Sequence, residues 1–206
     1  MIIKQYFELN ELQVRQFEQF YQKITFWNEK INLVSRKDIP HLWTRHILHS
    51  AMIAKIISFA PNTKILDVGT GGGFPGIPLA ILFPDCNFTL VDSITKKINA
   101  VQDIVQSLGL RNVKVQVIRA EHIQEKFDFV VSRAVAQLPQ FYAWVYQKID
   151  LNSKNTLKNG ILYLKGGKIQ NEVEQLALPV TVYSLAHFAD DEFFSTKYLV
   201  HVPVVK

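Results

Sequence analysis

The segment from Asp67 to Ala80, DVGTGGGFPGIPLA, constrains the fold of this chain more than any other. It places five glycines and two prolines in fourteen residues, directly after the short run Lys64-Ile65-Leu66. Glycine loses more backbone entropy on folding than any other residue, so a segment with this many glycines needs a compensating reason. Close approach of a ligand to the backbone is such a reason. The pattern is typical of a strand that turns into a helix beside a bound ligand, and it predicts an α/β fold.

Downstream of residue 64, short runs rich in Val, Ile and Phe alternate with helical patterns, which indicates a parallel sheet covered on both faces. The expected strands are residues 64–69, 87–92, 113–118, 127–132 and 161–165, and the expected helices are 76–83, 94–108, 138–149 and 168–177. Two more β runs, 180–185 and 198–205, have no helix predicted between them and should pair antiparallel as an edge hairpin. This order is the seven-stranded, Rossmann-like plan of class I methyltransferases.

The first sixty residues predict a helical extension to a core of residues 61–206. Asn10 is the expected N-cap of a first helix, with Gln13 three residues later, and apolar residues recur at helical spacing as far as Ile31. A second helix is expected to begin at Asp38 and Pro40 and to run to about residue 59. The aromatic stripe of the first helix is more typical of a buried core face than of a base-stacking surface.

Composition limits the classes of partner. The 206 residues include 23 Lys and Arg against 18 Asp and Glu, a mild excess that permits a polyanionic partner without requiring one. Cys86 is the only cysteine, which excludes an intramolecular disulfide and a thiolate zinc site. We expect a cytoplasmic protein, monomeric, with neither a signal peptide nor a membrane span.

The glycines alone leave the ligand open, because Gly71, Gly73 and Gly76 satisfy the G-x-G-x-x-G pattern of dinucleotide-binding proteins. Asp67, two residues before Gly69, is expected at the mouth of the turn, where it would repel a pyrophosphate but suits a ligand with an ammonium and a sulfonium group. S-adenosylmethionine is such a ligand. Two prolines in the same segment remove N–H donors that a phosphate would use.

A second carboxylate supports an adenosine ligand. Asp92 ends the next predicted strand, where a carboxylate can accept both ribose hydroxyls. Because NAD enzymes use the same device, Asp92 by itself indicates adenosine and not a particular cofactor. A nicotinamide-dependent dehydrogenase therefore remains a distant alternative at this point.

The acceptor is indicated by what the cleft lacks. The segment after the fourth strand, FDFVVSRA, has no Asn/Asp-Pro-Pro-aromatic motif for exocyclic amines, and Cys86 is badly placed to be a nucleophile. An acceptor with a free ring-nitrogen lone pair needs no base, so catalysis would depend on alignment and electrostatic preorganisation. Arg133 and Lys165, at strand ends, are the catalytic candidates, and a plain surface charge is an equal alternative for Lys165.

Several segments together resemble one family, the bacterial RsmG (GidB) methyltransferases. The resemblance covers nearly the whole chain and includes the following segments: 27–33 (WNEKINL), 45–50 (RHILHS), 67–81, 90–93 (LVDS) with 96–97 (KK), 108–110 (LGL) with 112–113 (NV), 119–121 (RAE), 132–136 (SRAVA) and 164–166 (LKG). It implies transfer of a methyl group from S-adenosylmethionine to guanine N7 in the 530-loop region of 16S rRNA.

The resemblance also implies roles for residues and partners. Around S-adenosylmethionine it implies Gly69, Phe74, Ala120, Glu121 and Arg133, beside Asp67, Gly71, Gly73 and Asp92. The substrate is ribosomal RNA, as free RNA, a 30S subunit or an assembly intermediate. Because N7 is buried in the deep groove of an RNA helix, a loop or splayed-out guanine is the expected target. Candidate RNA contacts, with a merely solvated face as the alternative, are Lys30, Arg36, Lys37, Arg45 and His46.

This chain departs from the family at two positions. His49 stands where an acid is common, and Lys97 stands where an Arg is common. The histidines at 41, 46 and 49 do not predict a metal site, because no well-placed carboxylate or cysteine accompanies them. A methyltransferase of a small metabolite and a non-catalytic RNA-binding module on the same fold both stay open as alternatives.

Overall fold

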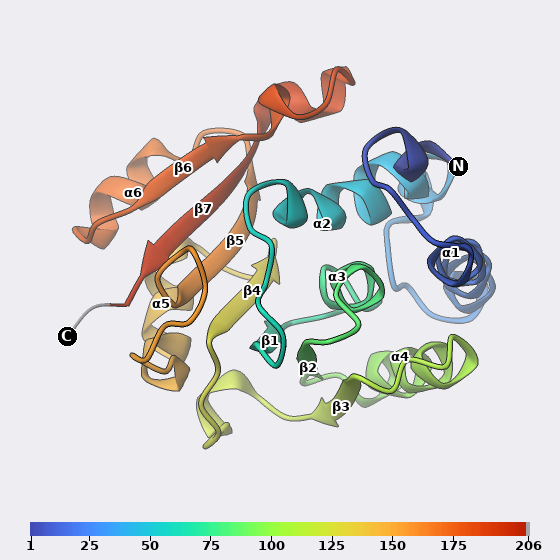
Figure 1. Ribbon diagram of the computed structural model, residues 1–206, viewed down its shortest axis with the longest axis horizontal. Helices are drawn as coiled ribbons and strands as arrows, with labels where there is room; N and C mark the ends of the chain where they lie inside the picture. The colour runs from blue at the N-terminus through green and yellow to red at the C-terminus, as the bar shows by residue number, and fades with distance from the viewer. Residues whose placement is uncertain (205–206) are drawn as a thin grey trace.

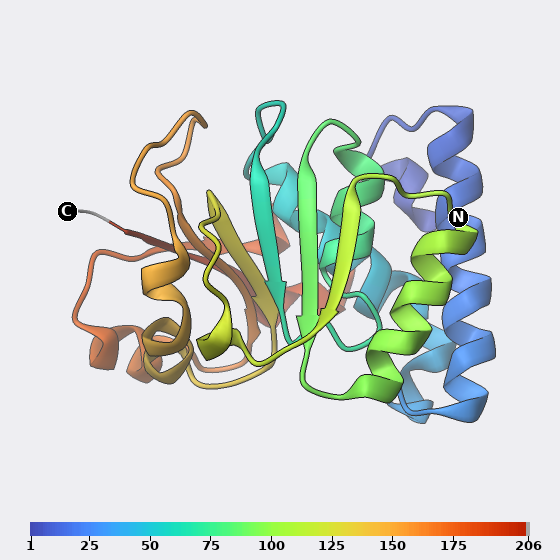
Figure 2. The ribbon, with the colours of Figure 1, turned by 90° about the horizontal axis from the view of Figure 1, so that it is seen from below.

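The computed structural model describes residues 1–204 and centres on one seven-stranded sheet of order β3-β2-β1-β4-β5-β7-β6 (Figure 1). β1 to β5 are parallel, whereas β7 pairs antiparallel with both β5 and β6. In Figure 2 the arrowheads of β1 to β4 point to the same edge. The strands are β1 (Lys64–Val68), β2 (Asn87–Asp92), β3 (Val113–Val117), β4 (Phe129–Arg133), β5 (Gly160–Gly166), β6 (Thr181–Ser184) and β7 (Lys197–Pro203). The predicted fold class is confirmed.

Helices cover both faces of the sheet because its central strands are apolar on both sides (Figure 1). One face packs against α3 (Gly76–Leu82) and α4 (Thr95–Ser107), with α1 (Glu11–Lys30) outside them. The other face packs against α5 (Leu138–Val145), and α6 (Gln170–Leu176) lies on the same side of the sheet. Each expected helix of the core is present, although α5 is shorter than predicted because a 3-10 turn, Tyr146–Lys148, replaces its end.

The first helix begins as the sequence predicts. Asn10 is the N-cap of α1, and its side chain accepts a hydrogen bond from the Gln13 N–H while the Gln13 side chain accepts one from the Asn10 N–H. This reciprocal capping box satisfies two N–H groups that have no partner inside the helix. A 3-10 turn, Ile2–Gln5, precedes the helix.

The second expected helix is not a continuous α-helix, so this prediction is wrong. Residues 36–55 form a 3-10 turn (Arg36–His41), a π-helical segment (Trp43–Leu48), one α turn, α2 (His49–Ala51), and a second 3-10 turn (Met52–Lys55). Asp38 is not an N-cap but lies inside the first turn, where its side chain contacts Arg45. The wider π turn changes the helical register, and Arg45, His46 and His49 all line the same cavity.

The C-terminal hairpin is confirmed in its pairing and corrected in its connection. β6 and β7 pair antiparallel, but two 3-10 turns, Leu185–His187 and Glu192–Thr196, lie between them. β7 rather than β6 pairs with β5, so the outermost strand is β6. The expected strand end at residue 205 lies outside the described residues.

The N-terminal extension shares a hydrophobic core with the sheet. Phe17, Phe20 and Ile24 of α1 belong to the same buried cluster as Phe88 of β2 and Phe129 of β4. The boundary expected near residue 60 therefore crosses a continuous apolar core. Within residues 1–204, no helix is long and apolar enough to span a membrane, and no group of three or more His, Cys, Asp or Glu side chains could hold a metal ion.

Candidate active site

Two neighbouring cavities lie at the carboxyl edge of the parallel strands, where open α/β sheets bind their ligands. The first, of about 630 Å³, is lined by the N-terminal helices, the glycine loop, the ends of β4 and β5, and the start of β7. The second, of about 360 Å³, is lined by the ends of β1 to β4 and by the turn that follows β3. Both are lined by Gly69, Lys97, Arg133 and Ala134, so the two cavities adjoin as one cleft. Each has the size of a small-molecule site.

Asp67 lies beneath the glycine loop and not at its mouth, which corrects the sequence prediction. Its side chain is 0% exposed, and Oδ2 accepts hydrogen bonds from Thr70 Oγ1 (2.7 Å) and the Gly76 N–H (2.8 Å). Oδ1 is buried without a hydrogen-bond partner among residues 1–204. Burial raises the pKa of Asp67 to about 7, against the opposing effect of these hydrogen bonds. The carboxylate ties the loop to the first turn of α3.

The glycines of the loop differ in what they permit. A Cβ on Gly76 would lie 2.7 Å from Asp67 Oδ2, so the bond between the two residues requires glycine. Gly73 lines neither cavity, and a Cβ on it would lie 2.4 Å from Ile77 Cδ1, so its predicted contact with the cofactor stays a prediction. Gly69 and Gly71 have φ of +68° and +57°, and both line the cleft. A Cβ on Gly71 would meet nothing closer than 4.0 Å, so bare backbone faces open space there.

Asp92 stands at the end of β2, as predicted, and lines the second cavity. Its two oxygens accept hydrogen bonds from the Gly71 N–H (3.1 Å) and the Ile94 N–H (3.0 Å). Each carboxylate oxygen has two lone pairs, so Asp92 can still accept hydroxyl donors from a ligand. Ala120 and Glu121 line the same cavity.

Arg133, at the end of β4, lies at the junction of the two cavities. Its guanidinium donates to the Arg45 carbonyl (3.1 Å) and to His46 Nδ1 (2.8 Å), and it lies 4.9 Å from the ring centroid of Phe74. Burial lowers the pKa of Arg133 to about 10, so the side chain stays protonated at neutral pH. Two of the five guanidinium N–H donors are used here, and the others remain for a ligand.

His46 links Arg133 to the N-terminal extension. Because Arg133 donates to Nδ1, we assign the ring proton to Nε2, which faces Asp38 Oδ2 at 3.5 Å. The imidazole is 9% exposed and packs edge-on against Phe74. Both ring nitrogens are thus engaged within the protein, and His46 is better placed to orient Arg133 than to contact RNA.

The segment after Arg133 is held by the hydroxyl of Tyr163. Ala134 has φ of +55°, and the Val135 and Ala136 N–H groups both donate to Tyr163 Oη (3.0 and 2.9 Å). The hydroxyl in turn donates to the Ala136 carbonyl (2.8 Å). A non-glycine residue at positive φ stores strain, and here the strained turn adjoins Arg133. The Tyr163 hydroxyl thereby fixes the direction in which Arg133 leaves β4.

Lys165 lines the first cavity but is already paired. Its ammonium lies 2.7 Å from Glu172 Oε2 of α6 and donates to the Ala136 carbonyl at 3.2 Å. These two contacts use two of the three ammonium donors and fasten the segment after β4 to α6. Cys86 is buried and lines neither cavity, and its burial raises the pKa of the thiol to about 11. It is therefore not placed to act as a nucleophile in the cleft.

The five predicted RNA contacts separate into two groups. Arg45 and His46 line the first cavity. Lys30, Arg36 and Lys37 lie on the exposed surface at the end of α1 and in the turn after it, outside the cleft. The Lys30 ammonium lies 3.9 Å from the ring centroid of Phe26, an exposed aromatic side chain on the same helix.

Comparison with known proteins identifies the family. A family model described as "rRNA small subunit methyltransferase G" (GidB) matches residues 13–191. The chain belongs to the GidB family. It is 52% identical over 203 residues to Ribosomal RNA small subunit methyltransferase G of Flavobacterium johnsoniae, covering 98% of this chain and 97% of that one. The protein of the same name from Cytophaga hutchinsonii is 51% identical, covering 98% of both chains.

Solved structures show the fold at low sequence identity. A SAM-dependent methyltransferase from Aquifex aeolicus matches with a TM-score of 0.58 at 16% identity, covering 83% of this chain and all of that one. A precorrin-6y C5,15-methyltransferase from Geobacter metallireducens matches with a TM-score of 0.53 at 12% identity, covering 84% and 90%. Both support the class I methyltransferase fold.

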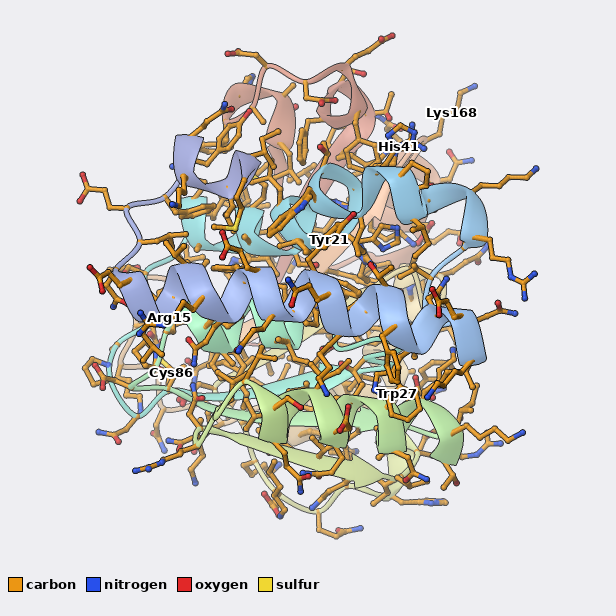
Figure 3. The ribbon with its side chains drawn as sticks, turned by 90° about the vertical axis from the view of Figure 1, so that its right-hand side faces the viewer. Arg15, Tyr21, Trp27, His41, Cys86 and Lys168 are labelled. Atoms are coloured by element: carbon orange, nitrogen blue, oxygen red, sulfur yellow. The ribbon has the colours of Figure 1, made fainter. Side chains whose placement is uncertain are left out.

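Some segments that carry the resemblance to the GidB family have structural tasks. Trp27, which points from α1 toward α4 in Figure 3, donates to Asp103 Oδ2 at 2.8 Å. The buried Asn28 side chain accepts hydrogen bonds from the Leu33 and Val34 N–H groups, both at 2.9 Å. These contacts fix the turn that brings Leu33 to the cleft.

Sequence reasoning missed Asp38, Tyr163, Phe193 and Lys197, all of which contact or line the site. Asp38 lies seven residues before Arg45, a spacing that allows the two side chains to pair across two helical turns. We instead expected Asp38 at the start of the second helix. Tyr163 looks like any apolar residue of a buried strand. Phe193 and Lys197 lie beyond the last parallel strand, where no local pattern indicates that the chain returns to the cleft.

We expect Tyr163→Phe to lower the free energy of unfolding by about 1–3 kcal/mol, because the Val135 and Ala136 N–H groups lose their acceptor. Methyl transfer should fall with it, since Arg133 leaves β4 through this segment. Urea unfolding and single-turnover transfer measure the two effects. Tyr183→Phe is the matched control, because the Tyr183 hydroxyl has no hydrogen bond within the part of the chain that the structure describes. Equal stability of the two variants would contradict the assignment.

His46 should remain neutral under mildly acidic conditions. Burial and the nearby Arg133 guanidinium lower the pKa of His46 from 6.5 to about 4, so the unfolded chain binds more protons between these values. His46 therefore contributes stability that is fully present above about pH 6.5 and is lost as the pH falls toward 4. Relative to His46→Gln, the wild type should lose about 2–3 kcal/mol of unfolding free energy between pH 7 and 4.5.

Urea unfolding at the two pH values measures this difference, and titrating groups that do not interact with His46 cancel between the variants. Nuclear magnetic resonance gives a direct check, because the His46 ring signals should not shift between pH 8 and 5.5. A titration centred near pH 6.5 would contradict the buried hydrogen-bonded arrangement.

Proposed function

We propose that this chain transfers a methyl group from S-adenosylmethionine to N7 of a guanine in the 530-loop region of 16S rRNA. Transfer is direct and in line, without a covalent intermediate. The observation that carries this proposal is the position of Arg133, a protonated side chain at the junction of two cavities beside a bare glycine backbone. The full-length similarity to enzymes named for small-subunit ribosomal RNA supports the substrate.

The cleft fits the cofactor in its donor set. The open backbone at Gly71 leaves room that any Cβ would reduce, and Asp92 has acceptor capacity for ribose hydroxyls. Ala120 and Glu121 line the cavity beyond Asp92 and would enclose the base, while Gly69 and Phe74 line the side nearer Arg133. Asp67 supports the loop from beneath. When bound, S-adenosylmethionine supplies an electrophilic methyl group on a sulfonium.

The protein works mainly by holding groups in place. Guanine N7 already has a lone pair, so no side chain needs to remove a proton from it. Arg133 retains free N–H donors, and arginine is well suited to the O6 edge of guanine, which lies beside N7. His46 and the Arg45 carbonyl orient the guanidinium. Lys165, paired with Glu172, is a positioning residue in this proposal.

The first cavity has room for a base taken out of its stack, and residues 1–60 supply one of its walls. We assign this extension two tasks: closing the cleft through Asp38, Arg45 and His46, and offering phosphate contacts at Lys30, Arg36 and Lys37. The protein would act in the cytoplasm on free RNA, an assembly intermediate or the finished 30S subunit, and as a monomer.

Tritiated methyl transfer to each of these three substrates tests the function. Incorporated label should make the RNA cleavable by borohydride and aniline at one guanine in the 530 loop. An RNA with 7-deazaguanine at that position is the matched control, because it lacks only N7. Label incorporated equally into the 7-deaza RNA would contradict transfer to N7, and label found only in a small metabolite would favour the alternative substrate class.

A further inference from the structure

One wall of the first cavity carries an aromatic and a cationic side chain from the segment that leads into β7. Phe193 and Lys197 line this wall, and Arg45 from the N-terminal extension faces them. Both cations lie near the Phe193 ring, with Lys197 Nζ at 4.5 Å and Arg45 Cζ at 5.9 Å from the ring centroid. Two chain segments about 150 residues apart in sequence thus meet across one aromatic ring.

Phe193 is held rigidly from behind. His49 and Phe194 both pack edge-on against it, at interplanar angles of 82° and centroid distances of 5.4 and 5.1 Å. Burial lowers the pKa of His49 well below its ordinary value, so this ring is neutral and acts as an apolar support.

Lys197 is a cation that has no counter-ion among residues 1–204. No carboxylate lies within 4 Å of its ammonium among residues 1–204, and its hydrogen-bond partner is the Thr196 hydroxyl at 3.0 Å. Gly166 of β5 makes room for it, since a Cβ there would lie 3.3 Å from Lys197 Nζ. Burial and the neighbouring Arg45 lower the pKa of Lys197. Arg45 has Asp38 as its counter-ion, whereas no carboxylate of residues 1–204 lies within 4 Å of Lys197, so a bound anion would relieve the repulsion between the two cations.

We propose that Lys197 and Arg45, both near Phe193, form a phosphate clamp for the RNA strand next to the methylated guanine. This inference rests on the proposed function and deepens it. Arg45 is partly neutralised by Asp38 at 3.2 Å, so Lys197 is the stronger member of the clamp. Asp38, which binds Arg45, directly follows Arg36 and Lys37 in the chain, so these two exposed cations can extend the phosphate contacts beyond the clamp.

Filter binding of a 530-loop RNA at several salt concentrations tests the clamp, with methyl transfer measured in parallel. We expect Lys197→Gln to weaken RNA binding about fivefold at low salt and to reduce the slope of log affinity against log salt by about 0.7–0.9, the loss of one phosphate contact. Lys197→Arg should keep both values. The matched control is Lys158→Gln, which removes an exposed lysine before β5 at the opposite edge of the sheet.

Calorimetry with S-adenosylmethionine separates the two anions that could reach Lys197. Unchanged cofactor affinity in Lys197→Gln together with weaker RNA binding supports the clamp. Weaker cofactor binding with an unchanged salt slope would overturn it in favour of the cofactor carboxylate. If wild type binds and methylates RNA and Lys197→Gln matches it at every salt concentration, the clamp alone fails. If wild type neither binds nor methylates the RNA, the proposed function fails with it.

Discussion

Asp67→Ala should weaken S-adenosylmethionine binding at least about 100-fold, as measured by calorimetry. The substitution removes the acceptor of the Thr70 hydroxyl and the Gly76 N–H, the two bonds that hold the glycine loop against α3. Each unpaired buried donor costs about 1–3 kcal/mol, and a loss near 3 kcal/mol in loop shape corresponds to this factor. The free energy of unfolding should fall as well, because Asp67 and its two hydrogen bonds are buried.

Asp67→Asn distinguishes the hydrogen bonds that Asp67 accepts from its negative charge. Asparagine keeps one oxygen acceptor and loses the negative charge, so binding within about tenfold of wild type would assign Asp67 to loop geometry. Loss of binding as severe as in Asp67→Ala would assign the effect to charge. Wild-type affinity in the alanine variant itself would contradict the role of Asp67 altogether.

Arg133→Ala should reduce single-turnover methyl transfer about 10²–10³-fold while S-adenosylmethionine still binds within about tenfold of wild type. Removing one preorganised donor from a reacting group typically has an effect of this size on rate. The cofactor retains the glycine loop and Asp92, which Arg133 does not hold directly. The His46 and Phe74 rings would lose their shared partner, so a small loss of stability is also expected.

Arg133→Lys keeps a cation but not the planar set of donors, and it should recover little activity. The matched control is Arg111→Ala, an exposed arginine before β3 at the other edge of the sheet, which should transfer methyl groups at the wild-type rate. A rate for Arg133→Ala close to that of Arg111→Ala would remove Arg133 from the catalytic residues.

Local sequence patterns predicted the elements well where each element satisfies its own requirements. The capping box of α1 needs only residues 10–13, and the buried strands β1, β2 and β4 show their apolar runs without reference to the rest of the chain. Residues 36–55 were predicted less well, because the broken helix there depends on what Asp38, Arg45 and His46 contact. Asp38 contacts Arg45 and His46 within the segment, but Arg133, which contacts both of them, lies about 90 residues away.

The site shows the same division. Sequence reasoning placed Asp92 and Arg133 at the carboxyl edge of the sheet. The apolar runs show where each strand ends, and the carboxyl ends of all parallel strands lie at that edge. It placed Asp67 at the mouth of the turn, whereas the side chain points beneath it and is wholly buried. The direction of a strand-end side chain depends on what packs above it, here Gly76 at a distance only glycine allows.

The sequence by itself determined the class of fold, the strand–loop–helix that bares its backbone, and the family, because each depends on short-range chemistry or on matched residues. Only the tertiary structure decided which polar groups face the cleft and which support it from behind. The physical reason is that burial and hydrogen bonding are set by neighbours distant in the chain, as in the meeting of Arg45, Phe193 and Lys197. No pattern within either segment encodes that meeting.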